Sequence, residues 1–74
     1  MSTGLDSEYA SLVLGQVEQM LVRPNETVAK GQLLCRISSS KMDLQIQART
    51  GGRVGFALGE GQKVVPGALV VTVE

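Results

Sequence analysis

The chain has 74 residues, the length of one small domain with a marginal hydrophobic core. Seven lysines and arginines balance seven aspartates and glutamates, so the sequence lacks the basic surplus of a nucleic-acid-binding protein. It has no histidine and a single cysteine, Cys35, which excludes histidine acid–base catalysis, a disulfide framework and the common zinc ligand sets.

The first ten residues are mostly polar, and we expect residues 1–10 to form a flexible leader ahead of a domain over residues 11–74. This leader lacks the positive start and apolar centre of a signal peptide. No segment of the sequence has the length and apolar character of a transmembrane helix. We therefore expect a soluble, cytoplasmic protein without a membrane partner.

From Ser11 onward, short runs of valine, leucine and isoleucine are separated by glycines and other turn residues. No run keeps the helical period of 3.6 residues over ten or more positions. The sequence also contains nine glycines, which punctuate these runs. The pattern predicts an all-β domain of short strands.

The two halves of this region repeat each other. Seven positions recur 36 or 37 residues later, namely Gly15/Gly52, Val17/Val54, Val28/Val64, Gly31/Gly67, Leu33/Leu69, Leu34/Val70 and Ile37/Val73. Asn25 also corresponds to Gly61, and both residue types tolerate a positive φ, so the same turn is expected in each half. The repeat predicts two similar β-units related by a pseudo-two-fold axis.

A β-hairpin is predicted between the two halves, with its tip at Lys41. The residues on both sides of Ser40-Lys41 alternate between apolar and polar, which is typical of strands with one buried face. A two-residue turn there predicts five facing pairs, namely Ile37/Leu44, Cys35/Ile46, Leu33/Ala48, Ser38/Asp43 and Arg36/Gln45. A slip by one residue would turn Asp43 toward the core, whereas a slip by two leaves Lys41 at or beside the tip.

Three residues at this tip allow more than one interpretation from the pattern alone. Ser-Lys is not the favoured chemistry of a two-residue hairpin turn, which suggests that something besides folding selected it. An exposed lysine is most often only a solvated charge. Met42 shares the phase of Leu44, so it belongs either to the edge of the core or to a contact surface.

Cys35 is expected to be a buried small hydrophobic residue.

The stretch from residue 11 to residue 74 resembles the biotinyl/lipoyl carrier domain family. The motifs match without a gap, namely Gly15-x-Val17, residues 22–33, Ile37, Lys41-Met42, Ala48, Gly52-x-Val54 and residues 59–69. The resemblance implies a flattened barrel-sandwich hybrid of two four-stranded antiparallel sheets, with the hairpin tip at Lys41. It also implies that Lys41 is the covalent attachment point of a prosthetic group, and that Ser40 and Met42 flank this group.

Biotin is the preferred prosthetic group under this resemblance. Biotinylated members carry Met-Lys-Met at the tip, and Met42 matches the second methionine. A biotin protein ligase would then modify Lys41. The biotin would take up a carboxyl group at a biotin carboxylase and deliver it at a carboxyltransferase. The domain itself would supply no catalytic residue, and we expect it to be a monomer in isolation.

Two alternatives stay open. The first is a lipoyl carrier domain of a 2-oxoacid dehydrogenase-type complex, with lipoate on Lys41. The second is an unmodified interaction module of the same fold. Ser40 matches neither the methionine of biotinylated members nor the aspartate of lipoylated ones, and Ser38 stands where both commonly have glutamate.

Overall fold

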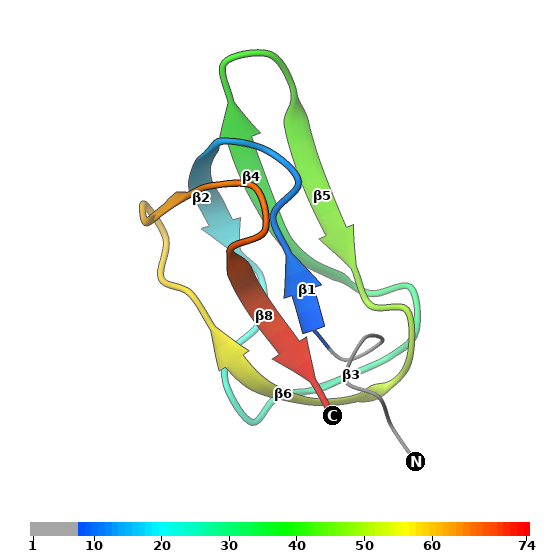
Figure 1. The fold of residues 1–74 in the computed structure, drawn as a ribbon. Coiled ribbons are helices and arrows are strands. Elements are labelled where there is room, and N and C mark those ends of the chain that lie inside the picture. The colour runs from blue at the N-terminus through cyan, green and yellow to red at the C-terminus, as the bar shows by residue number, and fades with distance from the viewer. Residues whose placement is uncertain (1–7) are drawn as a thin grey trace.

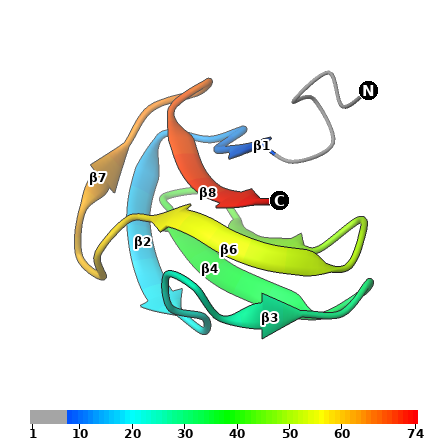
Figure 2. The ribbon, with the colours of Figure 1, turned by 90° about the horizontal axis from the view of Figure 1, so that it is seen from below.

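The computed structural model of the chain describes residues 8–74, which form strands and turns and contain no helix. The strands in chain order are β1 (Glu8–Ala10), β2 (Gly15–Met20), β3 (Thr27–Val28), β4 (Leu33–Ser39), β5 (Asp43–Gln47), β6 (Gly52–Ala57), β7 (Lys63–Val64) and β8 (Leu69–Val73). They make two four-stranded sheets with the orders β1-β8-β6-β3 and β5-β4-β2-β7 (Figures 1 and 2). Every pair is antiparallel, and within residues 8–74 the two sheets do not join into a closed barrel.

The expected pseudo-two-fold symmetry is present. Strands β2 and β6 have the same order of buried and exposed residues, and each packs one fully buried valine, Val17 or Val54, into the core. The left-handed turns also repeat, because Asn25 has a φ of 73° and its counterpart Gly61 a φ of 84°. The matched turn chemistry therefore holds the chain in the same conformation in both halves.

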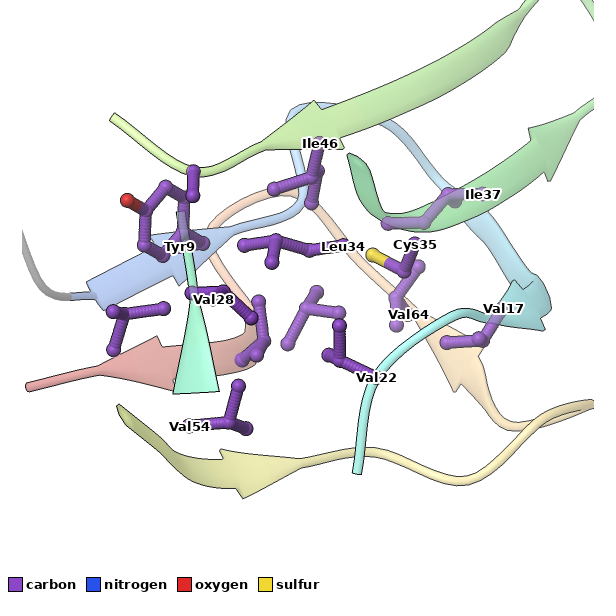
Figure 3. Packing of buried hydrophobic residues seen from close by; sticks show 14 residues of the cluster. Tyr9, Val17, Val22, Val28, Leu34, Cys35, Ile37, Ile46, Val54 and Val64 are labelled. Atoms are coloured by element: carbon purple, nitrogen blue, oxygen red, sulfur yellow. The ribbon is translucent and has the colours of Figure 1, made fainter. Parts of the chain in front are cut away.

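The core lies between the two sheets and is built from small and branched side chains of both (Figure 3). Its buried members are Tyr9, Val17, Val22, Val28, Leu34, Cys35, Ile37, Ile46, Ala48, Val54, Val64, Val70, Val71 and Val73. Valine and isoleucine favour strands because their branched side chains pack well on a pleated surface. The burial of Cys35 agrees with the expectation from its inward phase.

The boundary expected at residue 11 is wrong, because Glu8–Ala10 forms β1 and pairs with β8. Tyr9 is buried in the core, and its hydroxyl accepts a hydrogen bond of 2.8 Å from the backbone N–H of Arg49. The Arg49 guanidinium carbon lies 4.5 Å from the centre of the Tyr9 ring. A tyrosine in a polar stretch thus supplies both apolar area and a polar anchor. Residues 1–7 lie outside the described residues, so the flexible leader stays a prediction for them.

Four of the five predicted hairpin pairs are confirmed, and the fifth is wrong. Leu33 lies opposite Gln47 instead of Ala48, because the register between β4 and β5 shifts at Leu34. This irregularity turns two consecutive residues, Leu34 and Cys35, toward the core. A bulge of this kind places one extra residue in one strand and bends it.

Residues 8–74 contain no helix with the length and apolar character needed to cross a membrane. In the same residues, no group of three or more histidine, cysteine, aspartate or glutamate side chains is arranged to hold a metal ion.

Candidate functional site

The β4–β5 hairpin ends in a short connection that holds Lys41 in solvent. Strand β4 ends at Ser39 and β5 begins at Asp43, so Ser40, Lys41 and Met42 form the connection, and all three are exposed. In Figure 1 this connection lies at the top, at the end of the sandwich opposite the C-terminus. The alternation of buried and exposed residues in both strands fixes this position, because it sets the register of the hairpin.

The turn at the tip differs from the usual two-residue hairpin turns. Within residues 8–74 the only non-glycine residue with a positive φ is Asn25, so neither Ser40 nor Lys41 adopts the left-handed conformation of those turns. The side chain of Ser39 makes the connection instead. Its Oγ accepts hydrogen bonds from the N–H of Met42 at 3.1 Å and of Lys41 at 3.4 Å, and donates one to the carbonyl of Met42.

Met42 points away from the core. It is 58% exposed, whereas Leu44, two residues later in the same phase, is half-buried and packs against the core. The alternative that Met42 belongs to the edge of the core is therefore wrong. An exposed thioether beside the lysine is a flexible apolar contact for a bound group or a partner protein.

Gly15 allows the base of the hairpin to approach β2 very closely. It lies between Ser39 of β4 and Val64 of β7, and pairs with both. A Cβ at Gly15 would lie 1.9 Å from the carbonyl oxygen of Ser38, far inside contact distance. Only glycine fits there, so its backbone supports the last residues of β4 directly.

Two apolar hollows lie beside the tip, and Leu14 lines both of them. The larger has a volume of about 610 Å³, and its walls include Leu14, Ser38 to Ser40, Lys63 and Val65. The smaller has a volume of about 330 Å³ and reaches Lys41 and Met42. Leu14 is 68% exposed and Val65 is 55% exposed, so the surface around the lysine is more apolar than its serines suggest.

Cys35 takes no part in the chemistry of the tip. Burial raises the pKa of the Cys35 thiol from its ordinary value of 9.0 to about 11. Burial disfavours the thiolate, which is the nucleophilic form of cysteine, so the thiol stays protonated at neutral pH. At the tip itself, Lys41 is the exposed residue whose amine can form an amide.

The exposed amine of Lys41 suits covalent attachment through an amide. Attachment requires the amine to reach an activated carboxyl group, and Lys41 is exposed in the connection. The neighbours Ser40 and Met42 lie at the tip as expected from the sequence. Sequence reasoning missed the role of Ser39, although serine is a residue type that binds the backbone of a following turn through its hydroxyl. It also missed Leu14, an exposed leucine directly before Gly15.

The comparisons with known proteins agree with this arrangement. A biotin/lipoyl family model, described as "Biotin-requiring enzyme", matches residues 8–73. No curated protein matches the chain. The solved lipoyl domain of the 2-oxoglutarate dehydrogenase complex from Azotobacter vinelandii superposes with a TM-score of 0.77 at 20% identity, covering 92% of this chain and 95% of that one.

Two larger proteins contain the same fold as a part of their chains. The ectoine utilization protein EutE (DoeB) from Ruegeria pomeroyi has a TM-score of 0.79 at 27% identity. A succinylglutamate desuccinylase/aspartoacylase from Rhodobacter sphaeroides has a TM-score of 0.79 at 23% identity. In each case the match covers 93% of this chain and 22% of the other, so the chain spans about a fifth of the length of these two proteins.

Proposed function

Because the chain belongs to the biotin/lipoyl attachment domain family, we propose that it is a carrier domain with biotin attached to Lys41. The observation that carries this proposal is the position of Lys41 on a short, exposed hairpin connection, at the end of the sandwich opposite the C-terminus (Figure 1). Met42 follows the lysine as it does in biotinylated members of the family, and this favours biotin over lipoate.

In this proposal, the domain acts by positioning the prosthetic group. Biotin, when bound, supplies the atom that carries a carboxyl group between a biotin carboxylase and a carboxyltransferase. The long side chain of Lys41 gives the group reach, while the two sheets keep the attachment point rigid. Tethering raises the effective concentration of the group at both enzymes. No residue of this chain takes part in the chemistry at either site.

The partners in this proposal are a biotin protein ligase and the two enzymes between which the carboxyl group moves. They would contact the tip and its surroundings, namely Ser40, Met42 and the apolar hollows beside Leu14. The cytoplasmic location and the monomeric state expected from the sequence stay predictions.

The test is the intact mass of the protein after co-expression with a biotin protein ligase, and separately with a lipoate ligase. We expect the mass of one biotinyl group in the first case. Lys41→Arg should abolish the adduct and leave the fold intact, because an arginine side chain also extends into solvent but forms no amide. The matched control is Lys30→Arg, which changes another exposed lysine that lines neither hollow and should leave the adduct unchanged.

If only a lipoyl adduct forms, the prosthetic group on the domain is lipoate and not biotin. An adduct that persists in Lys41→Arg would show that Lys41 is not the attachment site. An unmodified mass with both ligases would contradict the carrier function.

The second candidate function is an unmodified module within a larger assembly. It is favoured by the ectoine utilization protein and the succinylglutamate desuccinylase/aspartoacylase, in which this fold makes up 22% of the chain. Ser38 and Ser40 also depart from the tip residues common in modified members. The same mass measurement separates the two candidates, because only a carrier gains the adduct.

A further inference from the structure

Ser39 joins the ladder of the hairpin to its tip through its side chain. The last backbone pair of β4 and β5 is Ser38 opposite Asp43. Beyond this pair, Ser39 Oγ accepts from the N–H groups of Met42 and Lys41 and donates to the Met42 carbonyl. A serine hydroxyl has one donor and two acceptor positions, so all three are used at the tip.

The neighbouring serines have different surroundings. The backbone of Ser38 pairs with Gln16 on one side and with Asp43 on the other, and Ser40 is exposed in the connection itself. Among the described residues, Ser39 is the only one of the three serines whose hydroxyl bonds to the backbone of the tip. The three serines are therefore not equivalent, although they are identical in the sequence.

The backbone of Ser39 is itself held by the sheet. It pairs with Gly15, and a Cβ on Gly15 would lie 3.3 Å from the Cα of Ser39, so the two backbones are in close contact. Gly15 also pairs with Val64 of β7. The hydroxyl therefore connects the tip to a part of the sheet that is paired on both sides.

We propose that Ser39 is a positioning residue for the modification of Lys41. Its hydroxyl fixes the backbone of Lys41 and Met42, so that the lysine side chain leaves the tip in one direction while its long stem remains free. This inference rests on the proposed carrier function, and it adds a residue that neither the family match nor the tip motif identifies.

The reaction served by this positioning is an acyl transfer. The neutral amine of Lys41 attacks the carbonyl carbon of an acyl adenylate of the prosthetic group, which the ligase supplies. A C–N amide bond forms, the C–O bond to the phosphate breaks, and AMP leaves with the bonding electrons, while one proton passes from the amine nitrogen to water. Ser39 touches none of these atoms, and it acts by favouring the backbone conformation from which the amine reaches them.

The first arm of the test measures the unmodified protein. We expect Ser39→Ala to lower the backbone ¹⁵N order parameters of Lys41 and Met42 from about 0.85 to below about 0.6, the range of flexible backbone. Ser40→Ala is the matched control and should leave both values unchanged. Equal order parameters in the wild type and Ser39→Ala would overturn the proposal, whether or not Lys41 is modified.

The second arm measures the ligase reaction with the folded domain as substrate. We expect Ser39→Ala to lower kcat/KM roughly fivefold, the effect of losing about one ordinary hydrogen bond. The loss should fall mainly on kcat, because the surface that the ligase contacts is retained. Ser39→Thr keeps the hydroxyl and should restore the rate. Thr50→Ala removes an exposed hydroxyl beyond the far end of β5, outside both hollows, and should match the wild type.

The outcomes of the two arms are distinguishable. A flexible tip with an unchanged rate of modification would overturn the positioning role, as would a Ser39→Thr variant as slow as Ser39→Ala. A wild type that neither ligase modifies contradicts the carrier function and with it any role in modification. In that case the order parameters still decide whether the hydroxyl holds the tip.

Discussion

The two β-units of this molecule share their core and their turns, but they differ where β4 meets β5. Strands β2 and β6 bury matched residues, and left-handed turns recur at Gly31 and Gly67 with φ values of 87° and 89°. The counterparts of β4 and β5 are β8 and β1. These pair with each other without a joining turn, since they come from opposite ends of the described chain.

This difference distinguishes the features that the fold requires from those that it does not require. The features present in both units are explained by packing and backbone conformation, because each unit must bury the same face. The connection with Lys41 has no counterpart in the second unit, and no core contact requires a lysine there. A function specific to the first unit is therefore best sought at this connection, and matched substitutions in the two units can test the comparison.

The largest effect is expected in the core, at the pair Leu34 and Val70, which are both fully buried. Leu34→Ala should lower the free energy of unfolding by about 4 kcal/mol, as removal of a buried leucine leaves a cavity. Val70→Ala removes less apolar area and should cost about 2 kcal/mol. Urea unfolding measures both, and a cost of Leu34→Ala below that of Val70→Ala would contradict the inward position given by the bulge.

A somewhat smaller effect is expected at the paired glycines Gly15 and Gly52. In both, an added Cβ would collide with a carbonyl oxygen, at 1.9 Å from Ser38 and 2.3 Å from Glu74. Ser38 is paired on both sides and cannot move easily, so Gly15→Ala should cost about 3 kcal/mol. Glu74 lies beyond the end of β8 and exchanges two backbone hydrogen bonds with Arg53 of β6. It should shift more easily than Ser38, which two strands hold, so Gly52→Ala should cost about 2 kcal/mol.

Thermal unfolding of the two alanine variants provides the measurement. Equal costs would mean that the base of the hairpin is no more rigid than the end of β8. That result would show that the two units do not differ in rigidity at the place where the function is proposed.

The next effect depends on pH, because Cys35 corresponds to Val71 in the repeat and only the cysteine ionises. The folded-state pKa is raised to about 11 from an ordinary 9.0, so the unfolded chain loses the thiol proton first. The contribution of the buried thiol to the free energy of unfolding is fully present below pH 9 and is lost as the pH rises through 11. Between these two pH values, the free energy of unfolding should fall by about 2 kcal/mol on account of Cys35.

Cys35→Val makes the first unit like the second at this position and should not show this loss. Urea titrations of the wild type and of Cys35→Val at pH 8, 9.5 and 11 would measure the difference, because the other ionising groups are common to both proteins. Parallel pH profiles for the two proteins would show that the thiol does not ionise differently in the folded state.

The smallest effect is expected at the left-handed glycines Gly31 and Gly67. A Cβ at either position meets no atom within 4 Å, so Gly→Ala introduces only the strain of a positive φ. Each substitution should cost about 1 kcal/mol, and the two costs should be equal within error. Unequal shifts in Tm would show that the two turns are not equivalent in solution.

Much of the first unit could be predicted from the sequence because its signals are local. The alternation around Ser40-Lys41 predicted which residues of β4 and β5 face each other from Cys35 to Asp43. The recurrence of residues at a spacing of 36 or 37 positions predicted the repeat. Asn25 and Gly61 marked the same turn, as their φ values confirm. The extent of the leader was not predictable, because Tyr9 is buried only when β1 pairs with β8 across more than 60 residues.

The sequence by itself determined the all-β class, the repeat and the position of Lys41 at the tip, since strand period, turn chemistry and register act between near neighbours in the chain. Only the tertiary structure decided the bulge that turns Leu34 inward, the exposure of Met42 and the difference between Ser39 and its neighbours. These features depend on contacts between segments distant in sequence, such as Gly15 against Ser38 and Ser39. Three identical serines carry no local signal of which hydroxyl will bind the tip, because the neighbouring strand sets the backbone from which each one points.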